Sequence, residues 1–265
     1  MQSAGVCHIR KNDEENKKKD PYLAHVIPET HQIQPLLNHH TNVRHLILNN
    51  CPLEILTSVA WLAATFHDCG KYGPEFQAYM EEVLEKAGEE VKRNVDHSTA
   101  GGRLITSLAP GMLASKIIST AIYSHHGLAD CINMESGRSL EEERNEKKID
   151  YDTITERFFQ YTDIDVIQEH IDRAKADSLK IMDSIAEMIN RDKPSVYGSG
   201  NFYLGMYERL LISLLIDSDW SDTASFFEQK GLPRRLSKEE TQHIWEQSIA
   251  YFEDYLSTLT ARDEK

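Results

Sequence analysis

The sequence contains no apolar run long enough to cross a membrane. Its longest apolar stretches, LTSVAWLAATF and LLISLLI, are well short of the ~18 residues that a transmembrane helix requires. The first twenty residues, MQSAGVCHIRKNDEENKKKD, contain no apolar segment of the kind found in a secretory signal. We therefore expect a cytoplasmic protein that does not bind a membrane.

Cysteine is also scarce. Cys7, Cys51, Cys69 and Cys131 lie far apart, and no two of them form a CxxC motif. This spacing argues against a disulfide framework and against a thiolate zinc site, so we expect reduced thiols. The sequence has no GxxxxGK[ST] phosphate-binding loop either, so the chain itself carries no P-loop ATPase motor.

Basic residues are outnumbered. The 29 Lys and Arg residues stand against 43 Asp and Glu residues, which gives a formal net charge of −14. Domains that grip nucleic acid normally present a basic patch to the phosphates. If the substrate is nucleic acid, bound metal ions, local lysines or a partner protein must help to hold it.

Strand-type alternation of polar and apolar residues is missing, so the predicted fold class is all-α. Four segments are expected to form core helices: 53–66, which is apolar on nearly every face, 96–108, 113–127 and 206–220. Asp96 or Ser98 is placed to cap the second of these helices, and Gly127 is placed to end the third.

The domain organisation is predicted from shifts in composition. Residues 1–20 are expected to form a mobile charged lead-in, and residues 21–265 a single domain. A polar insertion is expected over about 135–200. It comprises a loop or insertion at 135–152, an amphipathic helix at 167–189 and a turn-rich connector at 194–201. A C-terminal amphipathic helix is expected over about 237–260.

Histidines gather at the ends of the predicted core helices, and nine of the twelve lie between residues 25 and 126. Helix ends that meet in a bundle can bring such side chains to one point, where imidazole and carboxylate ligands suit divalent transition metals. A single His–Asp or His–His pair would equally suit an ordinary helix end, so the metal hypothesis depends on their occurring together. These residues are His67 and Asp68 for the first helix, His97 for the second, His125 and His126 for the third, and Asp217, Asp219 and Asp222 for the fourth.

Five motifs resemble one known family. HDCGKYGPEFQAYM is similar to the HDxGKxxxxFQ segment of the HD nuclease domain of the type I CRISPR-associated nuclease and helicase. YLAHVIPETHQIQPLLNHHTNV, DHSTAGG, YSHHG and LLIDSDWSDT fit the same family in the same order, so the resemblance runs from Tyr22 to Phe226. It implies an HD-domain helical bundle with a metal site where helix ends converge.

The resemblance further implies two divalent transition metal ions. Manganese, nickel, cobalt or iron suits a His-rich site better than magnesium does. Asp68 would bridge the two ions and is one predicted catalytic residue. Lys71, the other, would face the scissile phosphate, and His25 would contact substrate or support a ligand. The implied ligands are His39, His67, Asp68 and Asp219 for the first ion, and Asp68, His97, His125 and His126 for the second.

Two of these assignments have a competitor in the sequence. His40 directly follows His39, so the register of the first ligand can slip by one residue. Asp217 and Asp219 both precede Trp220, and the helical pattern does not show which of them is the ligand. In the family that this sequence resembles, the ligand is the acidic residue directly before the aromatic residue, which favours Asp219. The remaining histidines match no motif and are expected to be ordinary surface or core residues: His8, His31, His45, His170 and His243.

The function implied is metal-dependent endonuclease or exonuclease cleavage of single-stranded DNA in CRISPR interference, an antiviral defence. The implied partners are a superfamily 2 helicase, as a separate chain or a missing C-terminal part, and the CRISPR RNA-guided surveillance complex. One alternative is an HD phosphohydrolase acting on nucleotides or cyclic dinucleotides with the same ligands. Another is a non-catalytic binding module whose metal only holds the bundle together.

Overall fold

The computed structural model describes residues 21–86, 91, 95–127, 135–192, 199–232 and 236–259. The chain forms two compact units, Met1–Lys230 and Gly231–Lys265, which we describe separately. The lead-in expected at residues 1–20 lies outside the described residues, and a single domain over 21–265 stays a prediction. No helix among the described residues is both long enough and apolar enough to span a bilayer.

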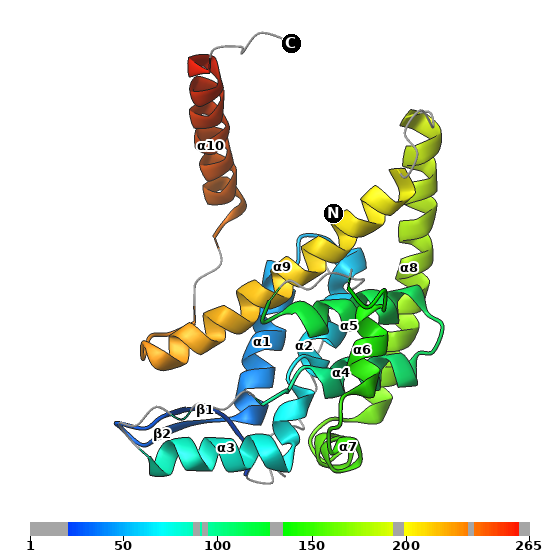
Figure 1. The fold of residues 1–265 in the computed structure, drawn as a ribbon. Coiled ribbons are helices and arrows are strands. Elements are labelled where there is room, and N and C mark those ends of the chain that lie inside the picture. Colours follow the sequence, from blue (N-terminus) through cyan, green and yellow to red (C-terminus); the bar gives the residue numbers. More distant parts are fainter. Residues whose placement is uncertain are drawn as a thin grey trace, which may run out of the picture. The chain divides into compact units, whose positions relative to one another are not determined.

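Helices dominate the first unit, which confirms the all-α prediction (Figure 1). Its first half contains β1 (Leu23–Ile27), β2 (Gln32–Pro35), α1 (Leu36–Asn50), the 3-10 helix η1 (Glu54–Leu56), α2 (Thr57–Phe66), the 3-10 helix η2 (Cys69–Tyr72) and α3 (Pro74–Glu85). Its second half contains α4 (Thr99–Leu108), α5 (Leu113–Ser124), α6 (Leu140–Glu146), α7 (Tyr151–Phe159), α8 (Ile164–Asp192) and α9 (Ser199–Phe227).

Helix α2 lies at the centre of the core. It packs against α1, α4, α5, α8 and α9, and eight of its ten residues are buried. Burial on all sides is why its sequence, TSVAWLAATF, is apolar on nearly every face, as predicted. The end of α2 therefore delivers the next two residues, His67 and Asp68, into the interior rather than to the surface.

One antiparallel hairpin, β1–β2, is a feature that the sequence did not predict. Leu23 pairs with Pro35 and Ile27 with Gln32, with an irregularity between Leu23 and His25. The strands have only five and four residues, too few for a clear alternation pattern. The hairpin packs against α1 and α3 and carries His25 on its first strand.

Residues 135–152, expected to form a loop or insertion, are not a loop, because α6 and the start of α7 fall within them. The Ser139 hydroxyl accepts from the Glu142 N–H, and the Glu142 side chain accepts from the Ser139 N–H. This reciprocal capping box begins α6 and was visible in the sequence as S-x-x-E. Further along the segment, Phe158 and Ile167 join the main hydrophobic core, and the amphipathic helix predicted at 167–189 is confirmed as α8.

Helix α9 is longer than predicted at both ends. Ser199 and Gly200, expected in a turn-rich connector, form its first turn, while residues 194–198 lie outside the described residues. A Cβ on Gly200 would lie 3.3 Å from Cδ1 of Ile189, so glycine permits α9 to approach α8 closely. At the other end the helix does not stop at its acidic residues but continues to Phe227, since no glycine or proline interrupts it.

The described residues of the second unit form one helix, α10 (Lys238–Thr258). Ser237 caps it through a capping box with Glu240, which agrees with the C-terminal helix predicted at 237–260. Cys51 and Cys69, the two cysteines within the described residues, are free thiols as expected.

Candidate metal centre

Five segments of the first unit bring their His and Asp side chains together in two adjoining groups. We call His39, His67, Asp68 and Asp219 the first group, and Asp68, His97, His125 and His126 the second group. Within each group, one potential ligand atom per residue lies within 4.8 Å of all the others. All seven predicted ligands are thus gathered. In four of the five segments the His and Asp residues of the site lie at or near a helix end. In the fifth, Asp219 projects from the side of α9.

The first group is almost completely buried. The Nε2 atom of His39 lies 3.0 Å from Oδ2 of Asp68, 3.2 Å from Nε2 of His67 and 3.3 Å from Oδ1 of Asp219. The side chains of His39, His67 and Asp68 are 0% exposed and that of Asp219 is 6% exposed. Burial of two carboxylates at such close range requires positive charge between them.

The second group is more open. The Nε2 atoms of His97 and His126 lie 2.5 Å apart, and Nε2 of His125 lies 3.4 Å from Oδ1 of Asp68. The His97 side chain is 19% exposed, and His126 is exposed. This group therefore faces the side from which a substrate could enter.

Asp68 joins the two groups through different oxygens. Its Oδ2 faces His39 and His67, and its Oδ1 faces His97 and His125. Within the described residues, Oδ1 of Asp68 and Nε2 of His125 are buried without a hydrogen-bond partner. Two such atoms that face each other need a shared cation, which is a proton on His125 or a metal ion, and the donor set fits divalent metal ions.

Hydrogen bonds fix the orientation of four imidazoles. The Nδ1–H groups of His67, His97 and His125 donate to the backbone carbonyls of Ala64, Val95 and Ile122, respectively. The Nδ1–H group of His39 donates to Oδ2 of Asp222 at 2.6 Å. Because an acceptor occupies Nδ1 in each case, Nε2 is left to face the group, the arrangement that metal-binding histidines normally have.

Asp222 was named with the acidic residues of the fourth predicted helix, but the sequence assigned it no role in the site. Besides His39, it accepts from Gln34 Nε2 at 2.8 Å and from Asn42 Nδ2 at 2.7 Å. Its spacing of three residues from Asp219 puts both carboxylates on the same side of α9. That spacing was a usable signal, but it required knowing that the helix continues past Asp219.

Lys71 and His25 lie at the edge of the first group. Lys71 is 3% exposed, and its Nζ lies 2.7 Å from Oδ2 of Asp68 and 3.3 Å from Nε2 of His25. The ring of His25 packs edge-on against that of His39, with centroids 4.9 Å apart. Lys71 thus turns back toward the site after Gly70, as the HDxGK spacing indicated.

The histidines of the centre differ in protonation state. Burial lowers the pKa of His125, but the carboxylate of Asp68 outweighs burial and raises it. Burial and the Lys71 ammonium lower the pKa of His39, but Asp219, Asp222 and Asp68 outweigh them and raise it to about 10. Burial lowers the pKa of His97 to about 4. Burial, with the charges of His125 and His97, lowers the pKa of His126 to about 3. In the metal-free protein a proton on His39 therefore supplies positive charge to the first group.

Gly70 is needed for the backbone to close around the site. Its N–H donates to the His97 carbonyl at 3.0 Å, and a Cβ on Gly70 would overlap the backbone of His97. The turn after Asp68 and the segment before α4 therefore touch directly, which links the first group to the second. Asp96, rather than Ser98, caps α4, because Oδ1 of Asp96 accepts from the Thr99 N–H at 2.9 Å.

The structure places one member of each ambiguous pair in the site. His40 is buried but lies outside both groups, and Asp217 is exposed and accepts from Asn50. Of the histidines without a motif, His170 stacks on Trp61 and His45 is hydrogen-bonded to Asn49. His31 and His243 are exposed, and His8 lies outside the described residues.

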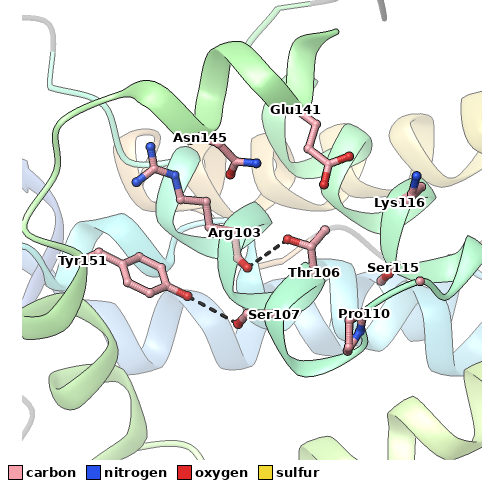
Figure 2. A pocket seen from close by; sticks show the side chains of 10 residues that line it. Arg103, Thr106, Ser107, Pro110, Ser115, Lys116, Glu141, Asn145 and Tyr151 are labelled. Carbon is pink, nitrogen blue, oxygen red and sulfur yellow. Dashed lines mark hydrogen bonds between the residues drawn. The ribbon is translucent and has the colours of Figure 1, made fainter.

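Two hollows differ in their relation to this centre. One of about 280 Å³ opens directly onto it and is lined by His25, Lys71, His126, Asp219, Trp220, Thr223 and Ala224. Another, of about 430 Å³, lies among α4, α5 and α6 and contains none of the predicted site residues (Figure 2). The first hollow is therefore the candidate substrate entrance.

The helical bundle and its buried His and Asp cluster define a metal-dependent hydrolase domain of the histidine–aspartate type. The family model described as "Cas3, HD domain" matches residues 10–225. The chain belongs to this family of metal-dependent nuclease domains of type I CRISPR systems. No curated protein matches the chain.

Proposed function

We propose that this domain hydrolyses phosphodiester bonds in single-stranded DNA with two bound divalent metal ions. The observation that carries the proposal is the position of Asp68, whose two oxygens face different groups of ligands. His39, His67 and Asp219 would hold one ion, and His97, His125 and His126 the other. Such ions activate water for attack, hold the phosphate and stabilise the leaving oxygen.

The chain's own residues have distinct tasks in this proposal. Asp68 keeps the two sites at a fixed separation because it is anchored on both sides. The Lys71 ammonium, beside Asp68, is placed to offset negative charge on the phosphate. The imidazoles of His97 and His126, whose pKa values are lowered, supply neutral ligands that do not cancel positive charge, so the site attracts phosphate despite the acidic chain.

Trp220 supports a nucleic-acid substrate. It lines the hollow at the centre, beside Asp219, and its side chain is 65% exposed. An exposed indole next to a phosphate-cleaving site offers a platform on which an unpaired base can stack, worth about 1–3 kcal/mol per base. A duplex keeps its bases stacked on one another, so this platform favours a single strand.

The family implies the partners and the metals. A superfamily 2 helicase would feed a displaced strand to this domain within an RNA-guided CRISPR surveillance complex. The His-rich donor set favours manganese, nickel, cobalt or iron over magnesium.

The test is cleavage of end-labelled single-stranded DNA by protein that is stripped of metal and resupplied with manganese, nickel or cobalt. We expect metal-dependent cleavage, its loss in Asp68→Ala, and retention of helical circular dichroism. Trp220→Ala should raise KM for the DNA roughly tenfold, since a base stack worth about 1–3 kcal/mol is lost. It should leave Mn²⁺ binding unchanged, because Trp220 is not among the residues of either group.

Two outcomes would contradict the proposal. Full cleavage by metal-loaded Asp68→Ala would show that Asp68 does not join two ions. Hydrolysis of nucleotides or cyclic dinucleotides without any cleavage of DNA would instead favour a small-molecule phosphohydrolase.

A further inference from the structure

Helix α6, within the segment expected to be a polar loop, contacts the backbone on both sides of the second group. The guanidinium of Arg144 donates through Nη1 to Oδ2 of Asp96 at 3.2 Å and to Oγ of Ser98 at 3.1 Å. Through Nη2 it donates to the carbonyl of Tyr123 at 2.9 Å. One side chain thus ties the start of α4 to the last turn of α5.

The partners of Arg144 are next to the ligands in the chain. Asp96 directly precedes His97, and Tyr123 lies two residues before His125. The side chain of Arg144 is 17% exposed and that of Asp96 is 21% exposed, so the pair is largely shielded from solvent. A planar guanidinium donates in two fixed directions, which allows one residue to set the distance between two segments.

Helix α6 is itself held in place by hydrogen bonds from α4. Arg103 of α4 donates through Nε to the Arg144 carbonyl at 3.1 Å and through Nη2 to the Lys147 carbonyl at 2.6 Å. Figure 2 shows the Arg103 side chain extending from α4 toward the helix that carries Asn145. Arg103 thus fixes the C-terminal end of α6, and Arg144 reaches back from that end to the ligand segments.

The two groups need this support unequally. In the first group, His39, His67 and Asp68 are 0% exposed, so the packed core holds them. In the second group, His97 is 19% exposed and His126 is exposed. Their relative position therefore depends more on hydrogen bonds to the segments that carry them.

We propose that Arg144 is a positioning residue that holds the second group in its ligating arrangement and so sets the affinity of the second metal ion. The inference rests on the two-ion site of the proposed function. Loss of a group that orients metal ligands typically costs 10- to 100-fold in affinity. Arg144→Ala should therefore weaken binding of the second Mn²⁺ at least tenfold and leave the first within about twofold of wild type.

The test is a titration of the metal-free full chain with Mn²⁺, in which free Mn²⁺ is followed by electron paramagnetic resonance without DNA. Arg138→Ala is the matched control. Arg138 lies just before α6 and pairs with the exposed Glu146 at the end of that helix, and it does not contact the segments that carry the ligands. It should bind both ions as wild type does. His126→Ala removes a ligand of the second group. Adding Arg144→Ala to this variant should weaken Mn²⁺ binding little further, because both changes act on the second ion.

Arg144→Lys provides a second variant if Arg144→Ala does not fold. Lysine keeps the charge but cannot bridge both segments, so we again expect selective loss of the second ion. Unchanged binding of both ions in a folded variant would overturn the inference, and so would equal weakening of both ions together with a lower melting temperature. Wild-type chain that binds fewer than two ions would instead overturn the two-ion function, and the inference with it.

Discussion

Oδ1 of Asp68 lies 3.4 Å from Nε2 of His125, and within the described residues neither atom has a hydrogen-bond partner. Both atoms are completely buried, so leaving them unsatisfied is costly unless an ion lies between them. The other oxygen of Asp68 is already surrounded by His39, His67 and Lys71. In the proposed two-ion site, Asp68 is therefore already placed as the shared carboxylate before any ion binds.

Lys71→Met should separate phosphate stabilisation from metal binding. Removal of the ammonium takes away a positive charge that competes with metal ions for Asp68. The affinity of the protein for Mn²⁺ should therefore equal that of the wild type or exceed it. The cleavage rate should fall about 100-fold, as it does when a single charge-stabilising donor is lost. Mn²⁺ titration and single-turnover cleavage measure the two effects. Lys86→Met, at an exposed lysine paired with Glu82, is the control, and parallel losses of affinity and rate would refute the role of Lys71.

Asp222→Asn should weaken the first ion selectively. The amide oxygen of asparagine can still accept the hydrogen bond from His39. It carries no negative charge, however, so His39 becomes a weaker ligand, and we expect a 10- to 100-fold loss of affinity for the first ion. The second ion should bind as before, as measured by Mn²⁺ titration. Asp217→Asn is the matched control, because Asp217 is exposed on the same helix. Equal effects of the two substitutions would show that His39 does not depend on Asp222.

Gly70→Ala should destabilise the fold and disrupt the second group. The new Cβ would overlap the backbone of His97, so the two segments must separate, at a cost of about 1–3 kcal/mol. Gly205→Ala is the control, because a Cβ there meets nothing within 4 Å and alanine favours a helix by about 1 kcal/mol. Thermal unfolding should show a lower melting temperature for Gly70→Ala and an equal or higher one for Gly205→Ala. A wild-type melting temperature for Gly70→Ala would contradict the close approach.

Sequence reasoning succeeded where local pattern determines structure. The buried helix before His67 and the histidines at helix ends both follow from residue type and spacing. The roles of Asp222 and Arg144 were not predicted, because they depend on contacts with residues 183 and 48 positions away in the chain, His39 and Asp96. The hairpin escaped because its strands are too short to show a period, and α6 because its capping box lay in a segment judged only by its polarity.

His170 should contribute to acid destabilisation away from the metal centre. Its ring stacks on Trp61 with centroids 3.9 Å apart. Burial, with the charge of Arg173, lowers the pKa of His170 from 6.5 to about 4. Between those values the unfolded chain binds the proton and the folded chain does not, so stability falls as the pH drops through this window.

His170→Gln should therefore lose less stability than wild type between pH 6.5 and pH 4, as measured by urea unfolding of metal-free protein. The substitution also removes the ring stack, so the change with pH is compared rather than the absolute stability. His45→Gln, at an exposed histidine, should follow the wild-type slope. An unchanged slope in His170→Gln would refute the prediction.

The central claim is that one carboxylate joins two metal ions, and magnetic coupling between them tests it most directly. Metal-free protein given two equivalents of Mn²⁺ should show the electron paramagnetic resonance signal of an exchange-coupled pair, because ions in two-metal sites lie about 3.5–4 Å apart. Asp68→Ala should abolish that signal while the protein remains folded. Uncoupled ions in the wild type, or coupling that survives in Asp68→Ala, would contradict the account.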